Sequence, residues 1–166
     1  GVFRCQPCFS LEAMITRSFL AAEDATLQMT LCTMLKSLAA APETYARVVR
    51  RLLDEAPIKA HRLIAAFARF DVRQYRRIVA SPALTLDDWG EVAEYLGRLA
   101  EENKDIANFM IDVYIAKSLR FENYIDAGFS KFIRNKVLFD RRLALHKLAA
   151  HPHVFGKYIL DVAARA

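Results

Sequence analysis

Apolar residues recur along this chain at the three- and four-residue spacing of amphipathic helices, and no apolar–polar alternation persists beyond a few positions. One stripe consists of Leu27, Leu31, Met34, Leu35 and Leu38. After the break at Pro42, a second consists of Tyr45, Val48, Val49, Leu52 and Leu53. The two stripes predict a first helical hairpin with its apolar faces buried.

Helical spacing continues to the end of the chain. Pro57 ends the second helix, and two further stripes before Ser81-Pro82 predict a second hairpin. Thr85, followed at the third position by Asp88, predicts the start of an inserted helix. Residues 106–116 are apolar on most sides, which is typical of a central, enclosed helix, and three more stripes follow. The sequence predicts an all-α fold of about seven to nine helices.

A weak internal repeat marks the helix starts. An aromatic residue followed at short spacing by charged and apolar ones begins four segments, at Tyr45, Tyr75, Tyr124 and Phe155. The first two copies and the last two lie roughly 30 residues apart, whereas the middle gap is longer and contains the inserted helix. Coincidence among amphipathic helices is the alternative. The repeat favours stacked antiparallel hairpins over residues 10–166, in one domain that follows a flexible N-terminal segment, 1–9.

Composition limits the class of protein. The 166 residues include only five glycines and five prolines, as expected of a packed globule with short loops. The net charge of +5 is a mild basic excess that does not identify a partner. Three cysteines, an odd number, indicate a reducing compartment. Charged residues interrupt every apolar run, so no membrane insertion is expected.

Cysteine and histidine suggest a metal or redox site but do not complete one. Cys5 and Cys8 have the spacing of a redox pair or of half a zinc site, without the strand–helix unit that redox chemistry expects. His151 and His153 are too close together for the histidines of a zinc finger. Cys32 lies within an apolar stripe and is expected in the core. We therefore expect no metal.

No catalytic constellation emerges from the remaining polar residues. His61 and His146 lack the spacing of a known acid–base or metal motif. The carboxylate pairs are expected on polar faces or at helix ends; they are Asp54-Glu55, Asp87-Asp88 and Glu101-Glu102. Gly128 and Gly156 do not form a phosphate-binding loop. The sequence predicts no catalytic residues, no cofactor and no small-molecule substrate.

RNA binding is the main competing function. Basic residues cluster on successive helices, at Arg47, Arg50, Arg51, then Arg69, Arg73, Arg76, Arg77, then Arg134, Lys136, Arg141 and Arg142. Arrays of hairpins that read RNA carry a polar base-reading side chain at a fixed place on each first helix. The corresponding stretches, 34–38 and 63–67, are mainly apolar, and acidic residues lie among the clusters. A solvated surface of mixed charge explains the arginines equally well.

The hairpins, the Tyr-x-Arg repeats at Tyr45 and Tyr75 and the apolar first-helix positions resemble a pentatricopeptide-like α-solenoid that has lost its RNA code. With the 18.9 kDa mass and a start at Gly1 without methionine, the chain resembles the extra eighteen-kilodalton subunit that euglenozoans, including trypanosomes, add to the catalytic head of mitochondrial ATP synthase. Such a start is expected of a processed mature chain or of a chain cut from a longer one.

The resemblance implies a noncatalytic structural subunit that docks on the α subunit of the ATP synthase head. It places the protein in the mitochondrial matrix, peripheral to the inner membrane through the complex. It supplies no catalytic, cofactor or metal residues, and no motif identifies the partner-binding residues. The alternative is an RNA-binding helical repeat protein of an organelle.

Overall fold

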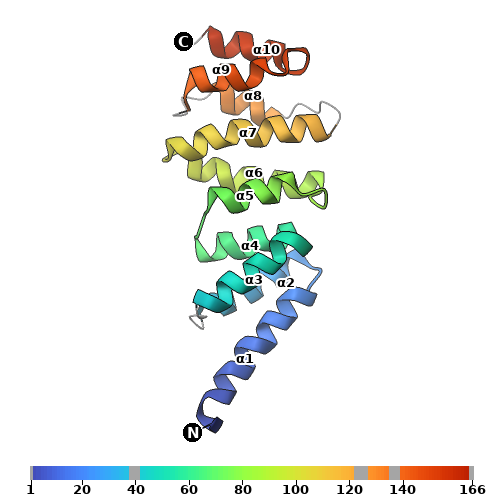
Figure 1. Ribbon diagram of the computed structural model, residues 1–166, viewed down its shortest axis with the longest axis vertical. Helices are drawn as coiled ribbons and strands as arrows, with labels where there is room; N and C mark the ends of the chain where they lie inside the picture. The colour runs from blue at the N-terminus through green and yellow to red at the C-terminus, as the bar shows by residue number, and fades with distance from the viewer. Residues whose placement is uncertain (1, 38–41, 122–126, 135–138, 165–166) are drawn as a thin grey trace. The chain divides into compact units, whose positions relative to one another are not determined.

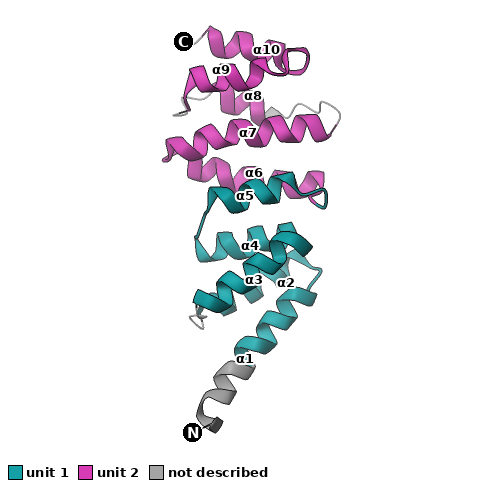
Figure 2. Cartoon of the chain, viewed as in Figure 1, with its two compact units in different colours: residues 1–83 teal, residues 84–166 magenta. Residues whose placement is uncertain are grey.

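The structure, a computed structural model, is all-α, as predicted: the described residues form ten helices and no strand (Figure 1). It describes residues 2–37, 42–121, 127–134 and 139–164, and for residues 2–10 and 127 the backbone alone. The helices fall into two compact units, Gly1–Ala83 and Leu84–Ala166 (Figure 2).

The described residues of the first unit form five helices. They are α1 (Val2–Ala21), α2 (Ala25–Ser37), α3 (Pro42–Glu55), α4 (Pro57–Phe67) and α5 (Val72–Ala80). α4 contacts α2, α3 and α5, and α1 packs against α2. Ala60, Leu63 and Ile64 of α4 are almost completely buried, so α4 forms the centre of this core.

Five helices also form within the described part of the second unit. They are α6 (Leu86–Ala100), α7 (Lys104–Arg120), α8 (Ala127–Arg134), α9 (Arg141–Ala149) and α10 (Pro152–Ala163). α7 packs against both α6 and α9, and most of its apolar residues are buried, which confirms the predicted enclosed helix. Phe129 of α8 is fully buried, with its ring 4.8 Å from that of Tyr114 and 4.7 Å from that of Tyr158.

Side-chain caps explain where several helices begin. Thr85 and Asp88 form the two reciprocal hydrogen bonds of a capping box at the start of α6, as predicted. Asp71, Asn103 and Asp140 accept hydrogen bonds from the first backbone amides of α5, α7 and α9.

The N-terminal part of the chain differs from the sequence-based picture. The backbone is helical from Val2, so the boundary predicted after residue 9 falls inside α1, and ten helices replace the predicted seven to nine. The first predicted hairpin paired α2 with α3, but α2 packs mainly against α1 and α4. An additional helix, α1, is therefore one of the two main neighbours of α2. The solenoid, and one domain over residues 10–166, stay predictions.

The aromatic residues of the predicted repeat occupy equivalent positions. Tyr45, Tyr75 and Phe155 are each the fourth residue of their helix, in α3, α5 and α10, and all three are buried. Tyr124 lies outside the described residues. The common position agrees with a repeated unit, although amphipathic helices that begin similarly would share it, so the repeat stays a prediction.

Candidate docking surface

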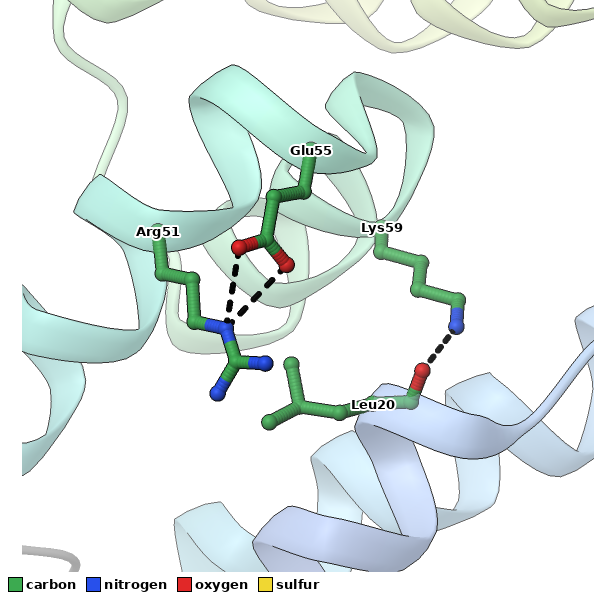
Figure 3. Close-up of polar contacts among 4 residues, drawn as sticks. All are labelled: Leu20, Arg51, Glu55 and Lys59. Carbon is green, nitrogen blue, oxygen red and sulfur yellow. Dashed lines mark hydrogen bonds and ion pairs between the residues drawn. The ribbon is translucent and has the colours of Figure 1, made fainter.

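Buried and half-buried polar contacts fix the C-terminal end of α1 in the first unit. Lys59 Nζ of α4 donates a 2.5 Å hydrogen bond to the carbonyl oxygen of Leu20 (Figure 3). Gln28 Nε2 of α2 donates to the carbonyl oxygen of Ala22 at 2.8 Å, and Arg62 donates to the side-chain oxygen of Gln28. Cations and donors at a helix C-terminus satisfy carbonyls that have no partner within the helix. These three hydrogen bonds hold the end of α1 in place against α2 and α4.

One flank of α1 forms a shallow apolar groove with α2. The groove has a volume of about 220 Å³ and is lined by Leu11, Ile15, Thr33, Met34 and Ser37. No charged side chain lines it. We call it the α1–α2 groove.

Part of the solvent-facing side of α2 continues this uncharged surface. Leu27 is 48% exposed, and Met29 and Met34 are each 43% exposed. The hydroxyls of Thr30 and Thr33 each donate a 3.0 Å hydrogen bond to a backbone carbonyl of the preceding turn. Because these hydroxyls are satisfied within the helix, the threonines add little polarity. The uncharged face of α2 therefore consists of Leu27, Thr30, Thr33, Met34 and Ser37, while Met29 lies at its edge, on the side of the exposed Lys36 two turns later.

The other flank of α1 forms a second groove, with α3. α1 packs on α2 whereas α3 packs on α4 and α5, which leaves a space of about 290 Å³ between the facing sides of α1 and α3. The lining residues of this α1–α3 groove are Glu12, Ala13, Thr16, Arg17, Leu20, Thr44, Arg47, Val48 and Arg51. The charged ones are three arginines and one glutamate, so the lining is net positive.

The three arginines of the α1–α3 groove differ in their contacts. Arg51 Nε lies 3.1 Å from a carboxylate oxygen of Glu55, one turn later on α3, and its guanidinium extends toward Leu20 (Figure 3). Arg17 and Arg47 are exposed and have no ion pair within the described part of the chain. Two positive charges at this groove are therefore not neutralised by neighbouring carboxylates.

The remaining predicted basic residues are dispersed. Arg50, Arg73 and Arg77 line a groove between α3 and α5, where Arg77 also pairs with Asp54. Arg69 lies over the ring of Tyr45, with its guanidinium carbon 4.8 Å from the ring centroid. Arg76 is exposed on α5. In the second unit Arg134, Arg141 and Arg142 are exposed, and Lys136 lies outside the described residues.

The four histidines are found in the core of the first unit, on helix surfaces and at the start of a helix. His61 is buried, and its Nδ1 lies 2.8 Å from the hydroxyl of Tyr75, in the core of the first unit. His146 and His153 are exposed, and His151 occupies the N-cap position of α10 without a side-chain hydrogen bond to that helix. The carboxylate pairs lie at helix ends or on exposed faces, as predicted. The three grooves described above contain no histidine.

Metal and redox chemistry finds no support in the described residues. Nowhere among them do three histidine, cysteine or acidic side chains gather as a metal site would require. Cys32 is fully buried, as expected of a core residue, and burial raises the pKa of its thiol to about 12, although the nearby Arg62 lowers it slightly. The side chains of Cys5 and Cys8 lie outside the described residues. Each described helix falls short of the length or hydropathy that a membrane span requires.

Two features of this surface were missed in the sequence. α1 carries apolar residues on several sides and forms no single stripe, so the residues that it contributes to both grooves were not singled out. Leu27 and Met34 were assigned to a buried stripe, but the buried positions of α2 are Gln28, Leu31, Cys32 and Leu35. Because Gln28 is polar, the hydropathy pattern places the buried face of α2 part of a turn away from the face that is buried in the structure.

Comparisons with models of known protein families, with curated proteins and with solved structures gave no match for this chain. Support for a function therefore comes from the surface of the first unit and from the resemblance described above.

Proposed function

We propose that this chain is a noncatalytic structural subunit that docks on a partner protein through the α1–α2 region of the first unit. The observation that carries the proposal is the uncharged face of α2 beside the α1–α2 groove. Charged residues make up 26% of the chain, yet Lys36 is the only one in α2. Contiguous exposed apolar residues on a soluble helix are characteristic of a surface that another protein covers.

Covering the exposed apolar residues of this face would contribute to docking. Leu27 and Met34 are each nearly half exposed, so covering each of them contributes about 1 kcal/mol. Leu11 and Met14 of α1 are also exposed, at 43% and 53%, and enlarge the apolar area. The polar contacts that fix the end of α1 hold the surface in one arrangement, which reduces the entropy lost on association.

The partner that the resemblance favours is the α subunit of the mitochondrial ATP synthase head, and the compartment is the matrix. A docking subunit of this kind requires neither a nucleotide site nor a metal. The uncharged face suits an apolar patch on the outside of such a subunit, because burying it leaves no unpaired charge behind.

Affinity purification from mitochondria tests the proposal. The tagged chain is compared with the double variant Leu27→Gln/Met34→Gln, with and without ribonuclease. As a matched control, Leu160→Gln removes an apolar side chain that is 72% exposed on α10 of the second unit. We expect the wild type and the control to recover ATP synthase head subunits in fixed ratio, and the double variant to recover at least about tenfold less. If the wild type retains no protein partner after ribonuclease treatment, the docking function is wrong.

RNA binding is the second candidate, and the groove between α3 and α5 favours it. Arg50, Arg73 and Arg77 line this groove, and three arginines in one groove suit the phosphates of a nucleic acid. The ion pair between Arg77 and Asp54 weakens the case. An RNA function predicts affinity that falls steeply with salt and is lost in Arg50→Gln/Arg73→Gln.

A further inference from the structure

We propose that the α1–α3 groove receives a two-turn amphipathic helix of the partner, with apolar residues on its inner face and acidic residues along its edges. The inference rests on the proposed docking function and assigns the groove a separate ligand from the one that covers the uncharged face of α2. The length of the groove, its lining and its charge support this ligand.

The length of the groove matches about two helical turns. On α1 the lining runs from Glu12 to Leu20, about 12 Å along a helix, and on α3 it runs from Thr44 to Arg51, about 10 Å. The lining residues of each helix recur at three- and four-residue spacing, so they form two facing ridges. A third helix that lies between two such ridges presents anchors at positions i, i+4 and i+7.

The floor of the groove is suited to small or medium apolar side chains. Ala13 and Leu20 line it from α1, and Val48 lines it from α3, where Val48 also belongs to the core. The volume of about 290 Å³ accommodates two or three aliphatic side chains, each of which gains free energy by leaving water.

The positive charges of the α1–α3 groove favour a ligand helix with acidic residues along its edges. Arg17 projects from α1 and Arg47 from α3, so the groove has an unneutralised cation on each of its two walls. Arg51, held by Glu55, adds a third guanidinium at the end of the groove near Leu20. Glu12 is the one acidic lining residue and disfavours a uniformly anionic ligand, which argues for a helix with acidic edges instead of a polyanion such as RNA.

Reversing the charges of Arg17 and Arg47 tests whether the ligand helix carries acidic residues along its edges. Arg17→Glu/Arg47→Glu is compared with Arg17→Lys/Arg47→Lys, which keeps both charges, and with Arg141→Glu/Arg142→Glu, which makes the same change in net charge on exposed positions of α9. In the ribonuclease-treated purification we expect the groove reversal to lower partner recovery at least about tenfold, and the other two variants to retain it. Equal retention by wild type and groove reversal overturns the inference while leaving the docking function intact; loss of the partner by wild type would instead refute docking itself.

Photocrosslinking identifies the occupant. p-Benzoylphenylalanine replaces Ala13 on the groove floor, and the crosslinked product from mitochondria is sequenced by mass spectrometry. The expected product is a partner segment with apolar residues three and four apart and with aspartate or glutamate on either side. A crosslink to RNA, to lipid or to a segment without acidic residues overturns the inference, as does the absence of any crosslink when the substituted protein still recovers its partner.

Once the segment is known, a charge swap completes the test. An arginine in place of the acidic residue nearest Arg47 should abolish recovery by the wild type and restore it for Arg47→Glu. Failure of this reciprocal rescue in either direction would mean that the two side chains do not meet.

Discussion

Arg62 donates a hydrogen bond to the side-chain oxygen of Gln28, and both side chains are buried in the first unit. The amide nitrogen of Gln28 in turn donates to the carbonyl oxygen of Ala22 at 2.8 Å. One glutamine therefore links the charged group of α4 to the end of α1. Since α1 forms a wall of both grooves, this contact connects core stability to the docking surface.

Replacing Gln28 with leucine should destabilise the protein although leucine is more apolar. The substitution removes one acceptor from a buried guanidinium and one donor from the end of α1, and we expect the free energy of unfolding to fall by about 2–3 kcal/mol. Urea denaturation measures it. Met29→Leu, at the adjacent exposed position, should change stability by less than about 0.5 kcal/mol. Wild-type stability in Gln28→Leu would show that the link contributes nothing.

Ala68 ends α4 with φ of 53°, the only non-glycine residue with positive φ in the described part of the chain. The left-handed conformation costs a residue with a Cβ about 1 kcal/mol relative to glycine. Ala68→Gly should therefore raise the free energy of unfolding by up to about 1 kcal/mol. Ala65→Gly, inside the same helix, should lower it by a similar amount. The prediction is wrong if the two substitutions change the free energy of unfolding in the same direction.

How far the sequence determined the structure can be judged from single helices. α6 was predictable because Thr85 and Asp88 supply a capping signal that requires only local residues. α7 was predictable because its apolar residues surround the helix. α1 was not predictable from periodicity. The apolar side chains of its residues 11–20 lie partly in the core, partly in the walls of the two grooves and partly in solvent. A helix that serves several surfaces has no single apolar stripe, and periodicity then carries little information.

The candidate surface was still harder to predict. Leu27 and Met34 have the spacing of core residues, and only the burial of Gln28 and Cys32 shows that the helix is rotated. Gln28 is buried because Arg62 and Ala22, six and more positions away in sequence, provide its hydrogen-bond partners. Polar burial that depends on tertiary partners cannot be inferred from hydropathy.

Phe129 should be a position of the second unit that is sensitive to loss of its aromatic ring. Its fully buried ring lies close to Tyr114 and Tyr158, with Phe155 at 6.0 Å. We expect Phe129→Leu to lower the free energy of unfolding by about 1–2 kcal/mol and Phe129→Ala by about 3–5 kcal/mol. Thermal and urea denaturation should rank the two in this order. Near-wild-type stability of Phe129→Ala would mean that the ring of Phe129 does not contribute to the core.

The thiol of Cys32 should be unreactive in the folded protein. Burial raises its pKa to about 12 from an ordinary value of 9.0, so almost no thiolate forms at neutral pH. In a Cys5→Ser/Cys8→Ser background Cys32 is the only remaining thiol. We expect 5,5′-dithiobis(2-nitrobenzoate) to label it promptly in denaturing urea and, under native conditions, only as fast as the first unit opens. Rapid native labelling would contradict the buried position.

The same shift gives a signed pH dependence. Above about pH 9 the thiol ionises in the unfolded chain but stays protonated in the folded one, so the unfolded state binds fewer protons and stability falls as pH rises toward 12. Below pH 9 both states are protonated, and the thiol adds no pH dependence. The variant Cys32→Ala lacks the thiol and therefore this pH dependence, while it keeps every other titrating group. The free energy of unfolding should therefore decrease more between about pH 8 and pH 10.5 in the wild type than in Cys32→Ala, and equal slopes would mean that the folded thiol ionises normally.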